Sequence, residues 1–256
     1  MRILLIRHGD PDYVNDTLTE KGRREAALLA KRAVSMNMGE CYKSPLGRAT
    51  DTAAPCLEVT GKTAEILDWL QEFPAQVDLN KNPELEKAYH DVKKDGEHFL
   101  PRIAWDMVPG YWTEHEAYMD KNAWRETEVA KNSDLVEVYD HVIEEFDRFL
   151  AEHGYVREGA HYCVEKESDE TVTFFCHFGI SCVLLSHLWN VSPFVLWHCL
   201  ALAPTSVTEV VTEEREQGTA YFRGLKVGDI SHLYAGGEEP SFAARFCETS
   251  SNKEQR

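Results

Sequence analysis

The sequence predicts an α/β protein with a doubly wound, mostly parallel sheet that is flanked by helices and carries an inserted helical cap. Two apolar runs, residues 3–6 and 172–176, suit strands that are buried on both faces, which is typical of parallel sheets. Amphipathic stretches of helical spacing lie between the strand-like runs, as in β-α-β units. The 256 residues, 43% of them hydrophobic, are enough for one large domain with an insertion.

The first apolar run ends in Arg7, His8 and Gly9. Side chains just past the carboxyl end of a parallel strand face the ligand crevice, so Arg7 and His8 are expected at that rim. Gly9 lets the chain turn sharply and lets a ligand approach the backbone. An isolated R-H-G has many chance matches, and a solvated charge after an ordinary strand is the alternative interpretation.

A helix and two further strands are expected next. Thr19 is a candidate N-cap for an alanine- and leucine-rich helix that ends before Gly39. Residues 40–43 and 64–67 are the two candidate strands. Such an alternation of helices and strands is what a doubly wound sheet requires.

Between those two strands, the sequence predicts a helix with an arginine in its first turn. Ser44 suits the N-cap and Pro45 suits the first helical position, where no amide is needed. Arg48 would then lie near the helix N-terminus, where free amides and the helix dipole attract anions. A surface charge is the alternative interpretation of Arg48. Pro55 is expected to kink this helix or to end it early.

Residues 74–131 have a different pattern, which is dense in aromatic residues and mixed charges. Asn82 is a candidate N-cap for a helix within this segment. We interpret 74–131 as a helical cap that is inserted into the domain, folds over the crevice and sets substrate specificity. Packing is the commoner role of such aromatic residues, and part of the set would serve both purposes.

The second half of the chain predicts a long helix and a second central strand. Ser133 or Asp134 opens an amphipathic helix that runs to about Leu150. Residues 161–165 and 171–176 are expected to be strands, and the second is apolar enough to be central.

The strand 171–176 runs directly into His177-Phe178-Gly179, and an apolar helix is expected from 180 to 189. A second buried strand therefore ends in a histidine, as the first one does. The remaining elements are a hairpin, 207–213 with 220–224, and a polar tail, 249–256, that is expected to be frayed.

The composition narrows the choice of partners and compartment. The formal net charge is −17, and an acidic surface repels the phosphates of nucleic acids and anionic membranes, so neither is expected as a partner. The seven cysteines are scattered, odd in number and without a C-x-x-C, which is typical of reduced cysteines in a cytoplasmic protein. No signal peptide and no membrane-spanning run are expected.

Two histidines and two arginines can form one pocket at the strand ends. The histidines are His8 and His177, and the arginines are Arg7 and Arg48. Guanidinium groups match phosphate oxygens bidentately and remain charged at any physiological pH. They also lower the pKa of a neighbouring imidazole, which keeps it neutral and nucleophilic. A phosphoryl group is therefore the expected ligand.

Five motifs resemble those of the histidine phosphatase superfamily, the two-histidine group that includes the cofactor-dependent phosphoglycerate mutases. They are R-H-G at 7–9, L-T-E-K-G at 18–22, S-P-L-G-R-A-T-D-T-A at 44–53, L-Q-E at 70–72 and H-F-G at 177–179. The motifs occur in the family's order and cover both halves of its catalytic domain. The resemblance implies a single phosphoglycerate mutase-like domain over 1–256, with its site at the carboxyl ends of the strands.

The resemblance also implies a role for each site residue. His8 would attack phosphorus and carry the phosphoryl group as a phosphohistidine. Arg7 and Arg48 would clamp the phosphate, while His177 would bind a phosphate oxygen and stabilise the transition state. Glu72, in L-Q-E, matches the proton donor to the leaving alcohol and would then take a proton from the attacking water. No metal ion or other cofactor is implied, because the arginines supply the positive charge.

Asn15 and Phe178 are two further candidates for substrate contact. Asn15 stands one position later than the family's asparagine, and Phe178 follows the second histidine. Pro11 replaces the family's serine and L-Q-E leads into Phe73-Pro74, so the mutase pattern is incomplete. Three aspartates stay open as alternatives to Glu72 as the acid: Asp10, Asp12 and Asp68.

The expected function is a metal-independent phosphatase that hydrolyses a small soluble phosphate monoester through a phosphohistidine on His8. A cofactor-dependent phosphoglycerate mutase is one alternative. A catalytically idle phospholigand-binding protein is another, although such a protein needs no acid at Glu72. A zinc site is a further hypothesis whose spacing matches no standard zinc pattern, and its ligands would be His161, Cys163, Cys176 and His177.

Overall fold

The computed structural model describes residues 1–241 and divides into two compact units. The first unit contains Met1–Glu72, Leu150–Ser181 and the described residues from Ala201 onward. The second unit contains Phe73–Phe149 and Cys182–Leu200. The expected polar tail, 249–256, lies outside the described residues. Within residues 1–241, no helix combines the length and the apolar character that crossing a bilayer requires.

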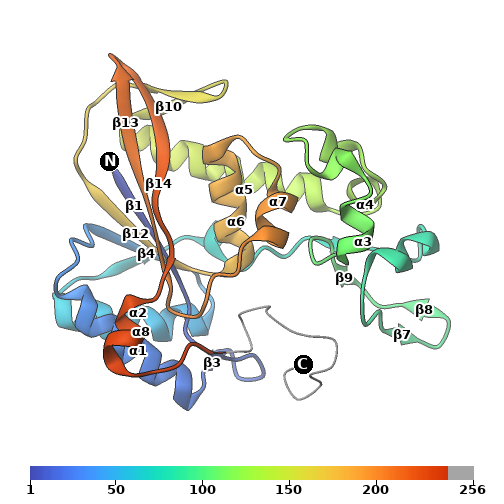
Figure 1. The fold of residues 1–256 in the computed structure, drawn as a ribbon, viewed down its shortest axis with the longest axis horizontal. Helices are drawn as coiled ribbons and strands as arrows, with labels where there is room; N and C mark the ends of the chain where they lie inside the picture. The colour runs from blue at the N-terminus through green and yellow to red at the C-terminus, as the bar shows by residue number, and fades with distance from the viewer. Residues whose placement is uncertain (242–256) are drawn as a thin grey trace. The chain divides into compact units, whose positions relative to one another are not determined.

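An eight-stranded sheet forms the centre of the first unit (Figure 1). Its strands are β1 (Arg2–Arg7), β4 (Glu40–Lys43), β5 (Ala64–Ile66), β10 (Tyr155–Glu158), β11 (His161–Val164), β12 (Thr171–Cys176), β13 (Val207–Glu216) and β14 (Thr219–Asp229). Their order is β10-β11-β14-β13-β1-β12-β4-β5. The neighbours β1, β12, β4 and β5 are parallel, and the other four strands join antiparallel, so six of the eight run in one direction. The predicted α/β fold with a mostly parallel sheet is confirmed.

Three neighbouring strands end at the same edge of this sheet. Arg7, the last residue of β1, is paired with Cys176, the last residue of β12. The last residue of β4, Lys43, is paired with Phe175, one position before the end of β12. The residues that follow these strands therefore leave the sheet side by side.

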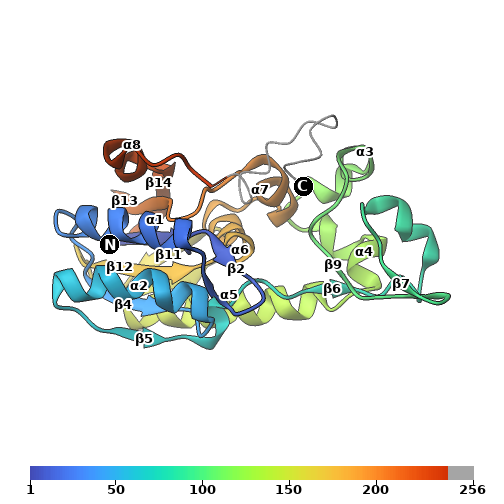
Figure 2. The ribbon, with the colours of Figure 1, turned by 90° about the horizontal axis from the view of Figure 1, so that it is seen from below.

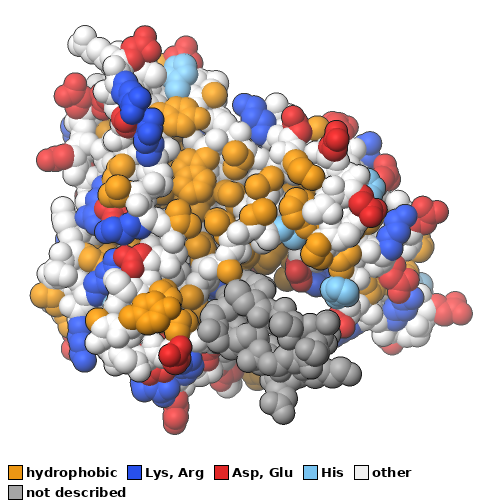
Figure 3. Space-filling view, in the orientation of Figure 1, with side chains coloured by type: hydrophobic (Ala, Val, Ile, Leu, Met, Phe, Trp, Pro, Cys, Tyr) orange, Lys and Arg blue, Asp and Glu red, His pale blue; other side chains and the backbone are white. Residues whose placement is uncertain are grey.

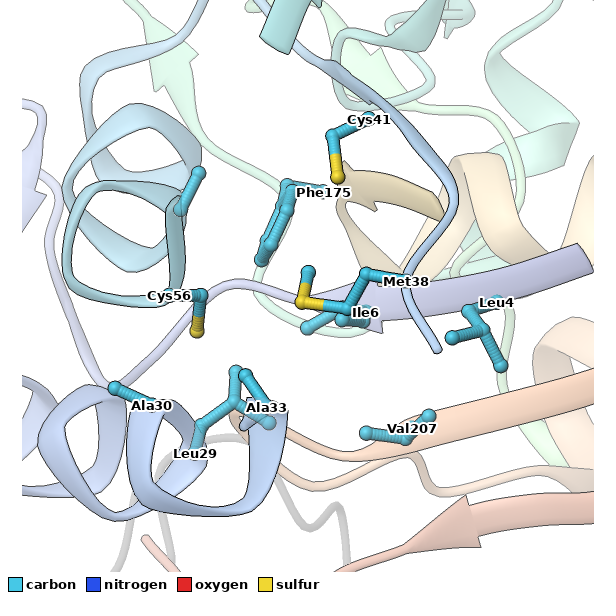
Figure 4. Packing of buried hydrophobic residues seen from close by; sticks show 11 residues of the cluster. Leu4, Ile6, Leu29, Ala30, Ala33, Met38, Cys41, Cys56, Phe175 and Val207 are labelled. Atoms are coloured by element: carbon cyan, nitrogen blue, oxygen red, sulfur yellow. The ribbon is translucent and has the colours of Figure 1, made fainter. Parts of the chain in front are cut away.

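The core of the first unit lies between the sheet and two helices, α1 (Glu20–Ala33) and α2 (Gly47–Thr60). The two helices lie side by side (Figure 2). Their small side chains face large apolar residues of the strands, such as Ile6 and Phe175, which are fully buried (Figure 4). Burial of an Ile or Phe side chain stabilises a fold by about 1.5–3 kcal/mol.

The start of α2 differs from the expectation that Ser44 caps it and Pro45 opens it. The helix begins at Gly47, and Leu46 occupies the N-cap position. The hydroxyl of Ser44 accepts a hydrogen bond from the Leu46 amide at 3.2 Å and is hydrogen-bonded to His177. Because this hydroxyl is used at the turn and at the histidine, it does not cap the helix.

The expectation that Pro55 ends or kinks α2 early is wrong with respect to the end. The helix continues past Pro55 to Thr60. A proline removes one backbone hydrogen bond from a helix, but Ala53 and Cys56 on either side of it are fully buried in the core. Their packing holds the helix against the sheet. The other predicted cap is confirmed, since Thr19 accepts from the Gly22 amide at the start of α1.

The second unit is less helical than the cap expected at 74–131. It contains short helices and two small two-stranded sheets in this segment. Their bounds are β6 (Gln76–Val77) with β9 (Arg102–Ile103), β7 (Lys94–Asp95) with β8 (His98–Phe99), η2 (Pro83–Ala88), α3 (Pro109–Trp112), η3 (Glu116–Tyr118), η4 (Ala123–Glu126) and α4 (Glu128–Lys131). Asn82 precedes η2, which is a 3-10 helix without a side-chain cap, so the α-helix expected there is wrong. Aromatic residues form this unit's core, where Phe194 packs against Tyr118 and Trp124 with ring centroids 4.8 and 6.0 Å apart.

Two helices pass from one unit to the other. They are α5 (Leu135–Glu152) and α6 (Phe178–Trp189). The sequence predicts both, and it also predicts the β13–β14 hairpin, whose turn lies at residues 217–218. The remaining elements are β2 (Pro11–Asp12), β3 (Thr17–Leu18), η1 (Asp68–Leu70), α7 (Pro193–Cys199) and α8 (Ser231–Gly236). The sequence predicts none of β10, α7 and α8, which are short.

Candidate active site

The strand ends bring His8 and His177 together. His8 follows β1 and His177 follows β12, and the His8 amide donates to the carbonyl of Cys176 at 3.0 Å. The two ring centroids are 5.0 Å apart, with the ring planes inclined by 57°. Both side chains are buried, at 1% and 0% exposure. The two imidazoles therefore lie side by side, buried, at this edge of the sheet.

The backbone around Gly9 orients the His8 ring. His8 Nδ1 donates to the carbonyl of Gly9 at 2.7 Å, because a carbonyl can only accept. In the neutral ring the lone pair is then on Nε2. Thr52 holds this turn, since its Oγ1 accepts from the Gly9 amide at 2.9 Å. A Cβ on Gly9 would lie 2.8 Å from the carbonyl oxygen of Gly22, so both glycines are needed for this approach.

Both histidines are held in the neutral form. Burial and, to a smaller extent, the charges of Arg7 and Arg48 lower the pKa of His8 to about 3. Burial also lowers the pKa of His177 well below its ordinary value, with added contributions from His8 and the two arginines. At physiological pH an uncharged imidazole at position 8 has a lone pair ready for attack on phosphorus.

Arg7 is fixed from several sides. Its side chain is buried, and its Nη1 donates to the carbonyl of Leu202. The ring of Phe178 lies 5.5 Å from the guanidinium carbon and is only 2% exposed. The structure therefore places Phe178, which the sequence suggests as a substrate contact, as a packing support for Arg7.

Arg48 has an acidic partner that the sequence does not predict. Arg48 Nη1 donates to Asp16 Oδ1 at 2.7 Å, and the Gly47 amide donates to Asp16 Oδ2 at 2.7 Å. The carboxylate of Asp16 thus occupies the N-terminus of α2, where the sequence predicts an anionic ligand. Arg48 Nε is buried and has no hydrogen-bond partner within residues 1–241. That nitrogen is available to a phosphate oxygen.

His177 is positioned by Ser44. The Ser44 hydroxyl lies 2.8 Å from His177 Nε2, and Ser44 itself is fully buried. Because the Leu46 amide donates to this hydroxyl oxygen, the arrangement favours a hydroxyl hydrogen that points to Nε2. The proton of the neutral ring is then on Nδ1. Nδ1 is buried and has no hydrogen-bond partner among the described residues, so it can donate to a phosphate oxygen.

Glu72 lies at the first turn of α6, the helix that follows His177. Its Oε1 accepts from the Ile180 amide at 3.2 Å. The preceding turn η1 is anchored by Trp69, whose ring packs edge-on against Phe174 of β12 with a centroid distance of 5.8 Å. The segment after β5 therefore brings a carboxylate to the helix that begins at the second histidine.

The alternative acids have other contacts. Both oxygens of Asp10 accept hydrogen bonds, one from Thr19 Oγ1 at 2.6 Å and one from Ser241 Oγ. Asp12 accepts from the side chain of Asn15 at 2.7 Å, and Asp68 is exposed. Of these four carboxylates, Glu72 is the one bonded to the helix that follows His177.

Asn15 stays a prediction as a substrate contact, and the zinc hypothesis is wrong. Asn15 is exposed and its side chain donates to Asp12 at 2.7 Å. The four ligands of the hypothetical zinc site do not meet. His161 and Cys163 lie on β11, and Cys176 ends β12. Three strands, β14, β13 and β1, separate β11 from β12. The structure brings together His8, His177, Arg7 and Arg48, with Glu72 at the adjoining helix.

Comparisons with known proteins agree with this geometry. The family model of the histidine phosphatase superfamily (branch 1) matches residues 3–104, a segment that contains four of the five motifs. A protein of Schizosaccharomyces pombe named as a probable phosphatase is 24% identical over 247 residues, which cover 91% of this chain and 95% of that protein.

Solved structures share the fold. A phosphoserine phosphatase from Entamoeba histolytica is 14% identical, with 91% of this chain and 98% of that chain covered and a TM-score of 0.56. A mycobacterial glucosyl-3-phosphoglycerate phosphatase is 17% identical, with 90% and 98% covered and a TM-score of 0.56. Because His177 lies outside the matched 3–104, the structure is what joins it to the matched motifs. The chain is therefore similar to the histidine phosphatase superfamily over residues 3–104, and to proteins named as phosphatases over about nine tenths of its length.

Proposed function

We propose that this protein is a phosphatase that needs no metal ion and hydrolyses a small soluble phosphate monoester through a phosphohistidine on His8. The observation that carries the proposal is a neutral, oriented imidazole beside two buried guanidinium groups. The bond from His8 Nδ1 to the Gly9 carbonyl leaves Nε2 as the nucleophile. Arg7 and Arg48 supply positive charge where the phosphoryl oxygens would lie.

In the first step, His8 Nε2 attacks phosphorus and the bond from phosphorus to the ester oxygen breaks. Glu72, in its acid form, donates a proton to the leaving oxygen. Arg7, Arg48 and the Nδ1 proton of His177 hold the non-bridging oxygens, over which the charge is spread in the transition state. These donors are fixed before the substrate arrives, so little reorganisation is needed.

In the second step, water attacks the phosphohistidine. The Glu72 carboxylate takes a proton from the water, the phosphorus–nitrogen bond breaks, and its electron pair returns to His8 Nε2. Inorganic phosphate leaves, and Glu72 is again an acid for the next cycle. The Ile180 amide, which donates to Glu72 Oε1, keeps the carboxyl group at one place through both steps.

We propose that the substrate is a small metabolite with one phosphate group. The Entamoeba histolytica structures contain phosphoserine and 3-phosphoglyceric acid, which are monoesters of this kind. The net charge of −17 disfavours large polyanions. On the face drawn in Figure 3, outside the grey residues, acidic and basic side chains are interspersed. We further propose that residues 74–131 set the choice of substrate, and that the enzyme works in the cytoplasm, where its free cysteines would stay reduced.

The test is hydrolysis of p-nitrophenyl phosphate in the presence of EDTA. We expect His8→Ala to lower kcat by about 10³-fold or more, because it removes the nucleophile. His90→Ala is the matched control, since His90 is exposed. Full turnover by His8→Ala would refute the nucleophile. The trapped phosphoenzyme is expected to be labile in acid and stable in base, and the reverse behaviour would indicate a carboxylate carrier.

A metabolite screen then separates the alternatives. Hydrolysis of phosphoserine or 3-phosphoglycerate without any bisphosphorylated primer would support the proposal that the protein is a phosphatase. Isomerisation that outpaces hydrolysis and depends on such a primer would indicate a mutase instead. Binding of inorganic phosphate without turnover of any ester would indicate a phospholigand-binding protein.

A further inference from the structure

The hairpin of β10 and β11 carries three potential metal ligands on one face. Glu158 ends β10 and is paired directly with His161, the first residue of β11. His161 and Cys163 point to the same face because side chains alternate along a strand, and a directly opposite pair shares a face. One oxygen, one ring nitrogen and one sulfur from these residues lie within 4.8 Å of one another.

This cluster shares two residues with the zinc site considered from the sequence. His161 and Cys163 belong to both, but Cys176 and His177 lie beyond three intervening strands and serve the active-site edge. Glu158, from the adjoining strand, is the third donor that the tertiary structure brings. The hairpin is at an edge of the sheet, since β10 is its last strand, so the cluster is separate from the two histidines of the active site.

We propose that Glu158, His161 and Cys163 form a binding site for a borderline-soft divalent transition-metal ion such as zinc. Thiolate, imidazole and carboxylate are the ligands that zinc takes in proteins, whereas calcium and magnesium require oxygen ligands. Cys163 Sγ lies 2.6 Å and His161 Nε2 lies 3.6 Å from Glu158 Oε2. In a tetrahedral site with bonds of about 2.0–2.3 Å, donors are about 3.3–3.8 Å apart, so small side-chain rotations suffice.

The charges around the cluster favour a cation. Within residues 1–241, the ion-pair partner of Glu158 is His161, and no lysine or arginine is paired with it. Arg157 turns to the other face of the hairpin, where its Nη1 donates to the Tyr162 hydroxyl at 3.0 Å. The cluster is partly exposed, so water can reach the metal as a fourth ligand.

Binding forms three bonds to the metal from lone pairs of oxygen, nitrogen and sulfur. The carboxylate and the neutral imidazole bind without a change of protonation, and the thiol of Cys163 releases its proton to solvent as the metal–sulfur bond forms. No oxidant or reductant is required.

The test is a titration of the full chain with cobalt(II), without chelators and with the thiols kept reduced. We expect a sulfur-to-cobalt charge-transfer band that saturates near one equivalent and that zinc(II) abolishes. Cys163→Ser should remove the band. His161→Ala and Glu158→Gln should each weaken cobalt binding by about tenfold or more. Cys199→Ser is the matched control, because Cys199 is an exposed thiol outside the hairpin.

Three results would overturn the proposal. They are the absence of a band at millimolar cobalt(II), a band that persists in Cys163→Ser, and a band that disappears in Cys199→Ser. Hydrolysis of p-nitrophenyl phosphate by the metal-free protein reports on folding, since none of the three ligands belongs to the active site. Equal activity of the variants and the parent therefore shows that a lost band reflects a lost ligand.

Discussion

Replacing Ser44 with alanine tests how the second histidine is positioned. The change removes the hydroxyl that lies 2.8 Å from His177 Nε2 and leaves this buried nitrogen without its partner. A buried polar atom that loses its partner costs about 1–3 kcal/mol. If His177 stabilises the transition state as proposed, the same energy appears as a loss of about 5- to 150-fold in kcat/KM, because each 1.4 kcal/mol is about tenfold.

The assay is the hydrolysis of p-nitrophenyl phosphate by Ser44→Ala and by a matched control, Ser186→Ala. Ser186 is also buried, and its hydroxyl bonds to the Val183 carbonyl and Tyr139 in the second unit. Both variants should lose stability, and only Ser44→Ala should lose kcat/KM. In a double-mutant cycle with His177→Asn, the two losses should not add, because Ser44 acts through the histidine. Wild-type kcat/KM in folded Ser44→Ala, or fully additive losses, would refute the reasoning.

Three further predictions concern the same edge of the sheet. Asp16→Ala should raise KM for p-nitrophenyl phosphate about fivefold with little change in kcat. The reason is that the half-exposed carboxylate orients Arg48, and such an ion pair contributes about 1 kcal/mol. A lower KM would show that the carboxylate competes with the substrate instead. The pKa of His8 is near 6.5 in the unfolded chain and about 3 in the folded one. The free energy of unfolding should therefore fall by about 4 kcal/mol as the pH is lowered from 6.5 to 3. Urea titrations at the two pH values should show a smaller fall for His8→Ala. Gly22→Ala should lower both Tm and activity, because its Cβ would lie 2.3 Å from a carbonyl oxygen of the loop after His8. Gly110→Ala is the control, since the space around its Cβ is open. Equal Tm values for the two variants would contradict this prediction.

Most of the contacts inside the site could not be predicted from the sequence. Asp16 and Arg48 are separated by 32 positions, and Ser44 and His177 by 133. Nothing local to either residue of a pair specifies the other, because a hydrogen bond between distant segments depends on how the loops pack. The S-P-L-G-R motif did contain a signal, since both Ser44 and Gly47 are constrained by site contacts.

Local rules also failed where packing was stronger. Pro55 did not end α2, because buried neighbours on both sides hold the helix against the sheet. The segment 74–131 is not a regular helical cap, because its short elements are organised around a shared aromatic core rather than by helical periodicity. In both cases the tertiary contacts outweigh the intrinsic preference of the segment.

The sequence by itself determined that two apolar strands end in Arg7-His8-Gly9 and His177-Phe178-Gly179, and that both strands belong to a parallel sheet. The structure makes these two strands neighbours, and the histidines meet because neighbouring parallel strands have their carboxyl ends at the same edge. Only the tertiary structure decided which nitrogen of each ring is hydrogen-bonded to the protein and which carboxylate contacts Arg48. Those choices depend on hydrogen bonds of about 3 Å between segments far apart in the chain, and such short distances follow from packing rather than from residue order.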